Sequence, residues 1–316
     1  MDIILADESA YRYWMKSRRG PSAAIPVPYK YSLSITREDI AAIAFDCGLT
    51  APIDLLITQE SNRRYDDGFT CHFERTGRVS CIVPIHEGFA VASPELCFLQ
   101  LARSANLQEL IFYGFRLCSS YRFNEFSPTG METVEPLMTV SSARTLLTRL
   151  SHCHGSKAAL TALGFIIENA ASPKEIEAAM RLCLPYHLGG YKLPKLELNP
   201  EIPLSKAAQR ALGRPSLKPD FFWREAKLLA EYQSDLTHLN PDQYNYDLKR
   251  MNVFASMGYK QIYIGSNHLS DYSAMDQLAN DIAKLLGKRI RPSQADFFSR
   301  QAQLVRTIRR LNDERI

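Results

Sequence analysis

The sequence predicts an α/β protein whose C-terminal part, residues 171–316, has a core with the element order αβββαβ. A capped helix begins at Ser172, a hairpin pattern spans residues 219–232, and a helical pattern at 246–257 leads to a short apolar strand at 261–264. Because a strand–helix–strand connection of this length joins parallel strands, we expect the last two strands to be parallel. The sheet should then be covered on both faces.

The preceding residues divide into an N-terminal helical segment, 1–50, and a mixed α+β region, 51–170. Thr36 and Asp39 predict the start of a helix, and Gly48 predicts its end. Four short β-rich runs follow, at residues 53–58, 69–73, 79–83 and 89–91. Ser93 and Pro94 then open a helical zone that covers residues 107–118 and 141–170, with a polar loop at 123–135 between them.

The elements of residues 171–316 follow from local signals. Ser172 and Glu175 form a capping-box pattern for a helix that runs to about residue 184, and a turn follows at Gly189 and Gly190. Residues 191–198 are predicted to form a strand. The hairpin turns around residues 224–226, and helices at 272–286 and 293–311 close the chain.

Composition restricts the class of protein. The 316 residues are 46% hydrophobic and 23% charged, with a net charge of +4, which is ordinary for a globular chain. No apolar run is long enough to span a bilayer, and the acidic N-terminus lacks the basic region of a signal peptide. The seven cysteines are odd in number and scattered. We therefore expect a cytoplasmic protein with reduced thiols and no membrane partner.

Positive charge is concentrated near the C-terminus. Between Lys284 and Arg310 there are eight Lys or Arg residues and one acid, Asp296. Such a segment on a nearly balanced chain fits a nucleic-acid contact, and a solvated helix face fits the charge pattern equally well. The candidate phosphate-binding residues on the last helix are Arg300, Arg306, Arg309 and Arg310.

Two acids in the hairpin are candidate metal ligands. Asp220 and Glu231 are separated by a tight turn, so they can lie near one another on adjacent strands. Glu231 follows the apolar run 228–230, where an unpaired charge is costly, and a divalent cation is one natural partner. The alternative is that Asp220 only starts a turn and Glu231 pairs with a nearby Lys or Arg.

This segment resembles the C-terminal domain of very-short-patch-repair endonuclease-like proteins, a branch of the PD-(D/E)xK nuclease superfamily. The resemblance is strongest to bacterial versions in which the domain follows an abortive-infection antitoxin-like region, and it extends more loosely over residues 53–118. The matching residues are Glu175, Pro219, Asp220, Glu231, Tyr232, Asp235, His238, Asp247, Arg250, Asn252 and Gly258.

The resemblance implies a restriction-endonuclease-like fold and roles for single residues. Asp220 and Glu231 would hold Mg²⁺ or Mn²⁺, Glu175 would be an acid facing the site, and His238 a general acid or phosphate contact. Glu175 has the competing role of completing the capping box, and His238 that of a solvated loop residue. Arg250 would contact a phosphate or simply pair with Asp247 on the same helix.

Gln233 departs from the pattern of the superfamily, which has lysine at this position, and from that of the related branch, which commonly has an acid. An amide carries no charge and is not a base at neutral pH. Asp235 faces the same side of a regular strand and is a candidate to compensate.

Two functions are consistent with these features. One is a metal-dependent DNA endonuclease or nickase of the repair or defence type. The other is a non-catalytic DNA-binding or antitoxin-like regulator, with a protein partner for the N-terminal region. His72, His86, Arg63 and Arg64 are interpreted as ordinary surface or core residues.

Overall fold

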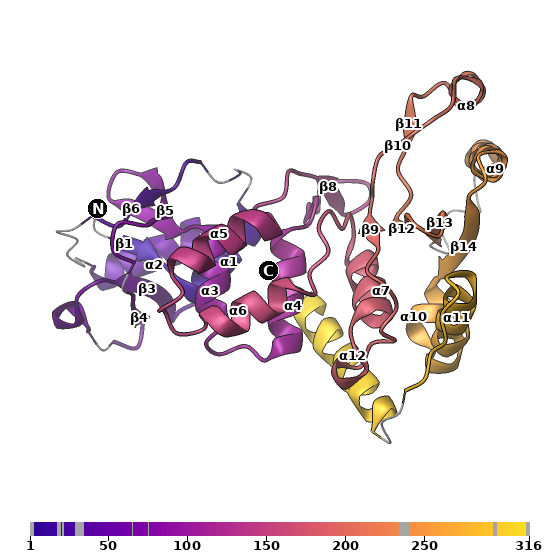
Figure 1. Ribbon diagram of the computed structural model, residues 1–316. Coiled ribbons are helices and arrows are strands. Elements are labelled where there is room, and N and C mark those ends of the chain that lie inside the picture. The colour runs from indigo at the N-terminus through magenta and orange to yellow at the C-terminus, as the bar shows by residue number, and fades with distance from the viewer. Residues whose placement is uncertain are drawn as a thin grey trace. The chain divides into compact units, whose positions relative to one another are not determined.

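The computed structural model describes residues 3–17, 20, 22–28, 35–64, 66–74, 76–233, 241–292 and 296–313. The chain forms two compact units, the first extending to Ile166 and the second covering Ile167–Asp313 (Figure 1). Both units mix helices with strands, so the α/β class is confirmed. Within the described ranges, no helix combines the length and the apolar character that a bilayer-spanning segment needs.

The first unit is built on a six-stranded mixed sheet with the order β2-β5-β6-β1-β3-β4. Its central strand β1 pairs in parallel with β6 and antiparallel with β3. The sheet strands are β1 (Ile3–Leu5), β2 (Ile25–Pro26), β3 (Ile53–Ile57), β4 (Phe69–Phe73), β5 (Ser80–His86) and β6 (Phe89–Ala92). The runs predicted between residues 53 and 92 are confirmed as strands.

Helices of the first unit begin at the predicted caps. The Thr36 hydroxyl accepts from the Asp39 N–H, and the Ser93 hydroxyl accepts from the Leu96 N–H. The helices are α1 (Asp7–Lys16), α2 (Arg37–Asp46), the single turn η1 (Glu60–Asn62), α3 (Pro94–Leu101), α4 (Leu107–Leu117), α5 (Val140–Arg149) and α6 (Ser156–Leu163).

Three expectations for the first unit were wrong. Residues 1–50 are not purely helical, because β1 and β2 join the sheet. The predicted loop at 123–135 contains a hairpin, β7 (Tyr121–Phe123) paired with β8 (Met131–Thr133). The helical zone 141–170 divides into α5 and α6, since Gly155 has φ +92°, which interrupts an α-helix.

The second unit contains a four-stranded sheet with the order β14-β13-β12-β9. Strand β12 (Phe221–Trp223) is antiparallel to β9 (Glu197–Leu198) and to β13 (Leu228–Gln233). Helix α9 (Pro241–Ser256) leads to β14 (Lys260–Gly265), which lies parallel to β13. The hairpin and the parallel crossover are therefore confirmed.

Side chains alternate between the two faces of this sheet. Phe222 and Leu229 pack against Val253 and Phe254 of α9 in one hydrophobic cluster. On the opposite face, Phe221 is also buried, as are its neighbours Leu228 and Ala230. Both faces are covered, as predicted for a strand–helix–strand crossover.

The segment between the first helix of this unit, α7 (Pro173–Cys183), and β12 differs from expectation. Residues 191–193 donate backbone hydrogen bonds to carbonyls near the end of α7, and only Glu197–Leu198 pairs as a strand. The short helix η2 (Tyr186–Leu188) precedes this stretch. An arm of β10 (Ile202–Pro203), α8 (Lys206–Leu212) and β11 (Ser216–Leu217), which the sequence patterns did not reveal, extends from the sheet (Figure 1).

Three helices complete the second unit: α10 (Ser266–Ser270), α11 (Tyr272–Leu285) and α12 (Phe297–Asp313). The predicted start of the last helix, residues 293–295, lies outside the described ranges. Its apolar positions Leu304, Val305 and Ile308 are buried, while Arg306 is exposed. The predicted amphipathic character is confirmed.

Candidate active site

The register of the hairpin brings the two predicted metal ligands together. Phe221 is paired with Ala230, so the next step of the antiparallel ladder sets Asp220 opposite Glu231. Asp220 lies just before β12, and its Oδ2 accepts a hydrogen bond of 2.7 Å from the Tyr232 N–H. Asp220 lies two residues before Phe222, and Glu231 lies two residues after Leu229. Because side chains alternate between the faces of a strand, both acids lie on the sheet face that α9 covers.

Arg250 of α9 forms an ion pair with Glu231. Its Nη2 lies 2.8 Å from Glu231 Oε1, and both side chains are largely buried. Burial raises the pKa of the Asp220 carboxyl, and it outweighs the hydrogen bond from the Tyr232 N–H and the positive charge of Arg250, which both lower this pKa. The expected pairing of Arg250 with Asp247 is not described, because the Asp247 side chain lies outside the described residues. The alternative expectation, that Glu231 pairs with a nearby Lys or Arg, is confirmed.

Glu175, at the start of α7, is the third acid of the cluster. Burial raises its pKa to about 7, and the negative charge of Asp220 contributes to that rise. Its carboxylate accepts from the Ala171 N–H at 2.7 Å and from the Ser172 hydroxyl at 2.8 Å. The Ser172 hydroxyl accepts in turn from the Glu175 N–H. The predicted N-cap is confirmed, but the capping box is not completed, because the Glu175 carboxylate accepts from the Ala171 N–H and not from the Ser172 N–H. The carboxylate lies close enough to Asp220 to be affected by its charge.

Asn199 connects Glu175 to Asp220 and was missed in the sequence. Its side-chain amide donates to Glu175 Oε2 at 2.6 Å, and its backbone N–H donates to the Asp220 carbonyl at 3.1 Å. Asn199 has φ +50°, a left-handed conformation that asparagine tolerates better than most residues. Its position directly after a strand and before Pro200 is the sequence signal that could have predicted a turn at Asn199.

The remaining candidates of the catalytic group are Gln233 and His238. Gln233 ends β13, two residues after Glu231 and therefore on the same face, and it is half-buried. His238 and Asp235 lie outside the described residues. Within the part of the chain that is described, no group of three or more His, Cys, Asp or Glu side chains is arranged to hold a metal ion.

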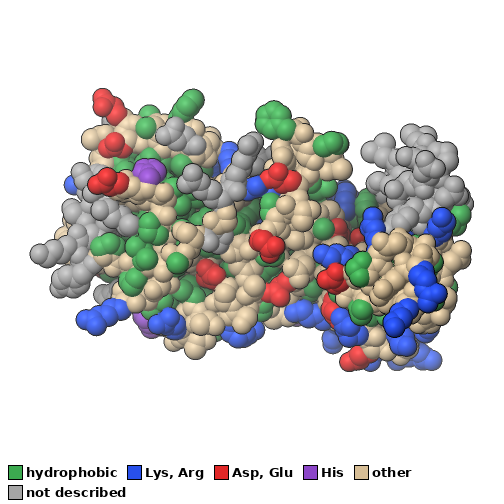
Figure 2. Space-filling model, turned by 90° about the horizontal axis from the view of Figure 1, so that it is seen from above, with side chains coloured by type: hydrophobic (Ala, Val, Ile, Leu, Met, Phe, Trp, Pro, Cys, Tyr) green, Lys and Arg blue, Asp and Glu red, His purple; other side chains and the backbone are tan. Residues whose placement is uncertain are grey.

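The arginines of α12 have contacts of their own. Arg300 pairs with Asp296 at 2.7 Å and donates to the His187 carbonyl, and Arg309 donates to the Leu269 carbonyl at 3.1 Å. Arg306 and Arg310 are exposed on the same helix. Lys and Arg side chains gather on the visible face of the second unit (Figure 2).

The first unit contains a polar cluster that the sequence interpretation treated as ordinary. His72 Nε2 lies 2.8 Å from Asp54 Oδ1, and His72 Nδ1 lies 3.5 Å from Asp7 Oδ2. Burial lowers the pKa of His72, but the hydrogen bond to Asp54 and the charges of both acids outweigh burial, so this pKa is raised. The residues are distant in sequence, and the fold brings the start of α1 beside β3 and β4.

We compared the chain with protein-family models, curated proteins and solved structures, and none of the three comparisons gives a match.

Proposed function

We propose that the second unit is a metal-dependent nuclease domain with a restriction-endonuclease-like core, acting on DNA as an endonuclease or nickase. The observation that carries the proposal is the convergence of Glu175, Asp220, Glu231 and Arg250 at one end of a mixed sheet. The element order α7, β9, β12, β13, α9, β14, with the arm inserted after β9, supports the same core.

The residues fit a divalent cation in one respect. Asp220 and Glu175 are buried near one another, and each has a raised carboxyl pKa. A cation relieves the repulsion between two neighbouring carboxylates. Mg²⁺ commonly binds through one or two carboxylates together with waters and substrate phosphate oxygens. Asp220 and Glu231 would hold it.

Each side chain has a distinct task in phosphodiester hydrolysis. Bound Mg²⁺ or Mn²⁺ would supply charge neutralisation and a more acidic water. Arg250 can exchange its contact with Glu231 for a phosphate oxygen, which a guanidinium binds well. Glu175, with a pKa of about 7, can take up or release a proton near neutrality. Gln233 can orient a water through its amide but cannot remove its proton.

The exposed arginines of α12 provide sequence-independent phosphate contacts in this proposal. Arg306 and Arg310 are exposed on this helix, and Arg300 forms an ion pair with Asp296. Each phosphate contact contributes to a steep dependence of affinity on salt concentration.

Cleavage of supercoiled plasmid tests the proposal. The full chain is incubated with Mg²⁺ or Mn²⁺ beside the double variant Asp220→Ala, Glu231→Ala, with Glu201→Ala as a control that removes an exposed acid of the same unit. We expect metal-dependent nicking or cleavage that the double variant loses and the control retains. Absence of any metal-dependent cleavage by the unaltered chain contradicts the nuclease proposal.

A second function is favoured by the Glu231–Arg250 ion pair at 2.8 Å together with the neutral Gln233. The ion pair engages Glu231 and Arg250 with each other, and Gln233 has no charge. Both features suit a non-catalytic DNA-binding or antitoxin-like regulator whose first unit contacts a protein. This alternative predicts salt-sensitive DNA binding without cleavage, and weaker binding of the Arg306→Gln, Arg310→Gln variant.

A further inference from the structure

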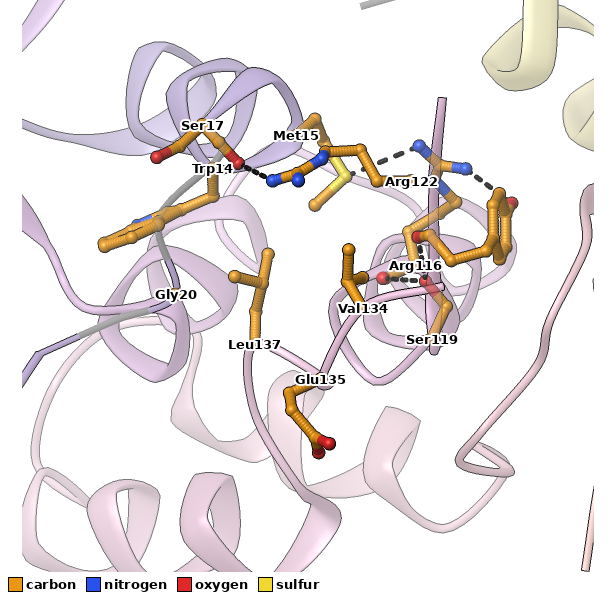
Figure 3. A pocket seen from close by; sticks show the side chains of 11 residues that line it. Trp14, Met15, Ser17, Gly20, Arg116, Ser119, Arg122, Val134, Glu135 and Leu137 are labelled. Carbon is orange, nitrogen blue, oxygen red and sulfur yellow. Dashed lines mark hydrogen bonds between the residues drawn. The ribbon is translucent and has the colours of Figure 1, made fainter. Parts of the chain in front are cut away.

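The first unit contains a cavity of about 350 Å³. Residues at the end of α1, the end of α4, strand β7 and the segment 134–137 line it (Figure 3). Its apolar wall consists of Trp14, Met15, Val134 and Leu137. The volume is within the range of small-molecule sites, which are largely apolar and contain a few polar groups.

The main polar group of this cavity is a buried arginine. Arg116 is only 7% exposed, and burial alone lowers its pKa, but the neighbouring Tyr121 and Tyr11 outweigh burial and the pKa is raised. The guanidinium is therefore charged. It lies 4.8 Å from the ring centroid of Tyr121 and 4.9 Å from that of Phe123.

No carboxylate among the described residues forms an ion pair with Arg116. Its Nη1 donates to the Tyr121 hydroxyl and its Nη2 to the Met15 sulfur at 3.6 Å, which is a weak acceptor, and the guanidinium also hydrogen-bonds with the Tyr11 hydroxyl. Buried charges are usually paired, because desolvating an isolated ion is costly. Tyrosine hydroxyls and a thioether carry no negative charge, so these described neighbours do not neutralise the positive charge of Arg116.

The other charged residues of the cavity do not supply the missing anion. Arg122 is paired with Glu132, with Nε 3.0 Å from Oε1, and also donates to the Ser17 carbonyl. Glu135 belongs to the lining, but its carboxylate points away from both guanidinium groups (Figure 3). Residues 17–35, which continue from this wall, contain no Asp or Glu.

We propose that this cavity binds a small organic monocarboxylate with an apolar body. The carboxylate would meet Arg116, whose planar fork matches its two oxygens, and the apolar body would contact Trp14, Val134 and Leu137. Among the described lining residues, Arg116 is the one positive charge without an acidic partner, and a single charge matches a monoanion better than a phosphate ester. The Trp14 ring is held in place, because its Nε1 donates to the Ala92 carbonyl at 2.8 Å.

Trp14 provides a direct readout of binding. The chain has two tryptophans, and Trp223→Phe in the full-length protein leaves Trp14 as the single reporter. This variant is titrated with 3-phenylpropionate and hexanoate, and with the neutral 3-phenylpropanamide. Calorimetry on the unaltered chain provides an independent measurement. We expect a saturable change in fluorescence with at least one acid and none with the amide.

Variants distinguish recognition of the charge from a structural role. Arg116→Met should weaken binding of the acid by about 10- to 100-fold, the range expected for lost hydrogen bonds to a charged group. Its melting temperature should be unchanged or higher, because an unpaired buried charge has been removed. Arg149→Met makes the same change at an exposed site of the same unit and should bind like the parent.

A second variant addresses the case in which Arg116→Met does not fold. Val134→Trp fills the cavity from its half-buried wall and should abolish binding while Arg116 remains. The proposal is overturned if neither acid gives saturable binding to the unaltered chain, if the amide binds as well as the acid, or if Val134→Trp binds normally. Tighter binding of phenyl phosphate than of 3-phenylpropionate would overturn the choice of a carboxylate.

Discussion

At the scale of single residues, Glu175 is an acid whose ionised form the fold disfavours. Its pKa of about 7 is raised from 4.5, so the folded chain binds an extra proton between these two pH values. Stability therefore falls as pH rises through this window, and the effect is complete above pH 7. A shift of this size corresponds to about 3 kcal/mol.

Substitution of Glu175 tests this linkage. Glu175→Gln should make the protein more stable than the parent at about pH 8, by up to about 3 kcal/mol, and the gain should vanish near about pH 4. Urea denaturation at a series of pH values measures the difference, and Glu168→Gln is a control at a second acid of the same unit. A gain that does not change with pH would contradict the assigned pKa.

A divalent cation should change the same pH dependence. If Asp220 and Glu231 hold Mg²⁺ beside Glu175, the cation favours ionised carboxylates and raises the melting temperature at about pH 8 more than at about pH 5. Thermal unfolding with and without MgCl₂ measures this shift. Asp220→Asn should remove it, and an equal shift in parent and variant would indicate a non-specific salt effect.

His72 in the first unit has the opposite linkage to Glu175. Its pKa is raised above 6.5, so the imidazolium contributes stability that is fully present below that value and lost as pH rises through the folded pKa. His72→Gln should therefore cost more stability at about pH 5.5 than at about pH 9. Denaturation at both values measures the cost, and an equal cost at the two values would contradict the raised pKa of His72.

At the scale of elements, the contact between α12 and the turn after α7 depends on the absence of a side chain. Gly189 has φ +82°, and a Cβ placed there would lie 2.5 Å from the Arg300 carbonyl oxygen. Both the conformation and the close approach favour glycine.

Gly189→Ala should consequently lower stability by about 2 kcal/mol or more, because the backbone of α12 has to move. Gly213→Ala is the matched control: Gly213 has φ +68°, but a Cβ there would meet nothing within 4 Å. This control should cost only about 1 kcal/mol. Equal losses in chemical denaturation would mean that the approach to α12 is not what requires glycine.

At the scale of the whole molecule, each unit has a sheet and a buried core of its own. Residues 167–313, expressed alone, should therefore fold and unfold in one cooperative transition. Calorimetry on this fragment and on the full chain measures the transitions. A fragment without a cooperative transition would show that the second unit requires the first.

Much of the fold could be predicted because its signals are local. Caps at Thr36, Ser93 and Ser172 need only a hydroxyl and a nearby backbone N–H. The hairpin that sets Asp220 opposite Glu231 follows from strand alternation and a short turn. The bounds of a strand could not be predicted where its residues form hydrogen bonds with another element. Residues 191–193, for example, donate to carbonyls near the end of α7 and not to a neighbouring strand.

The sequence by itself determined the α/β class, the order of the elements around the hairpin and the two opposed acids. Only the tertiary structure decided that Arg250 meets Glu231, that Asn199 joins Glu175 to Asp220, and that Arg116 lies buried in a cavity. The reason is physical. Periodicity and capping act over a few residues, whereas these contacts join side chains from different elements, and their distances depend on how those elements pack.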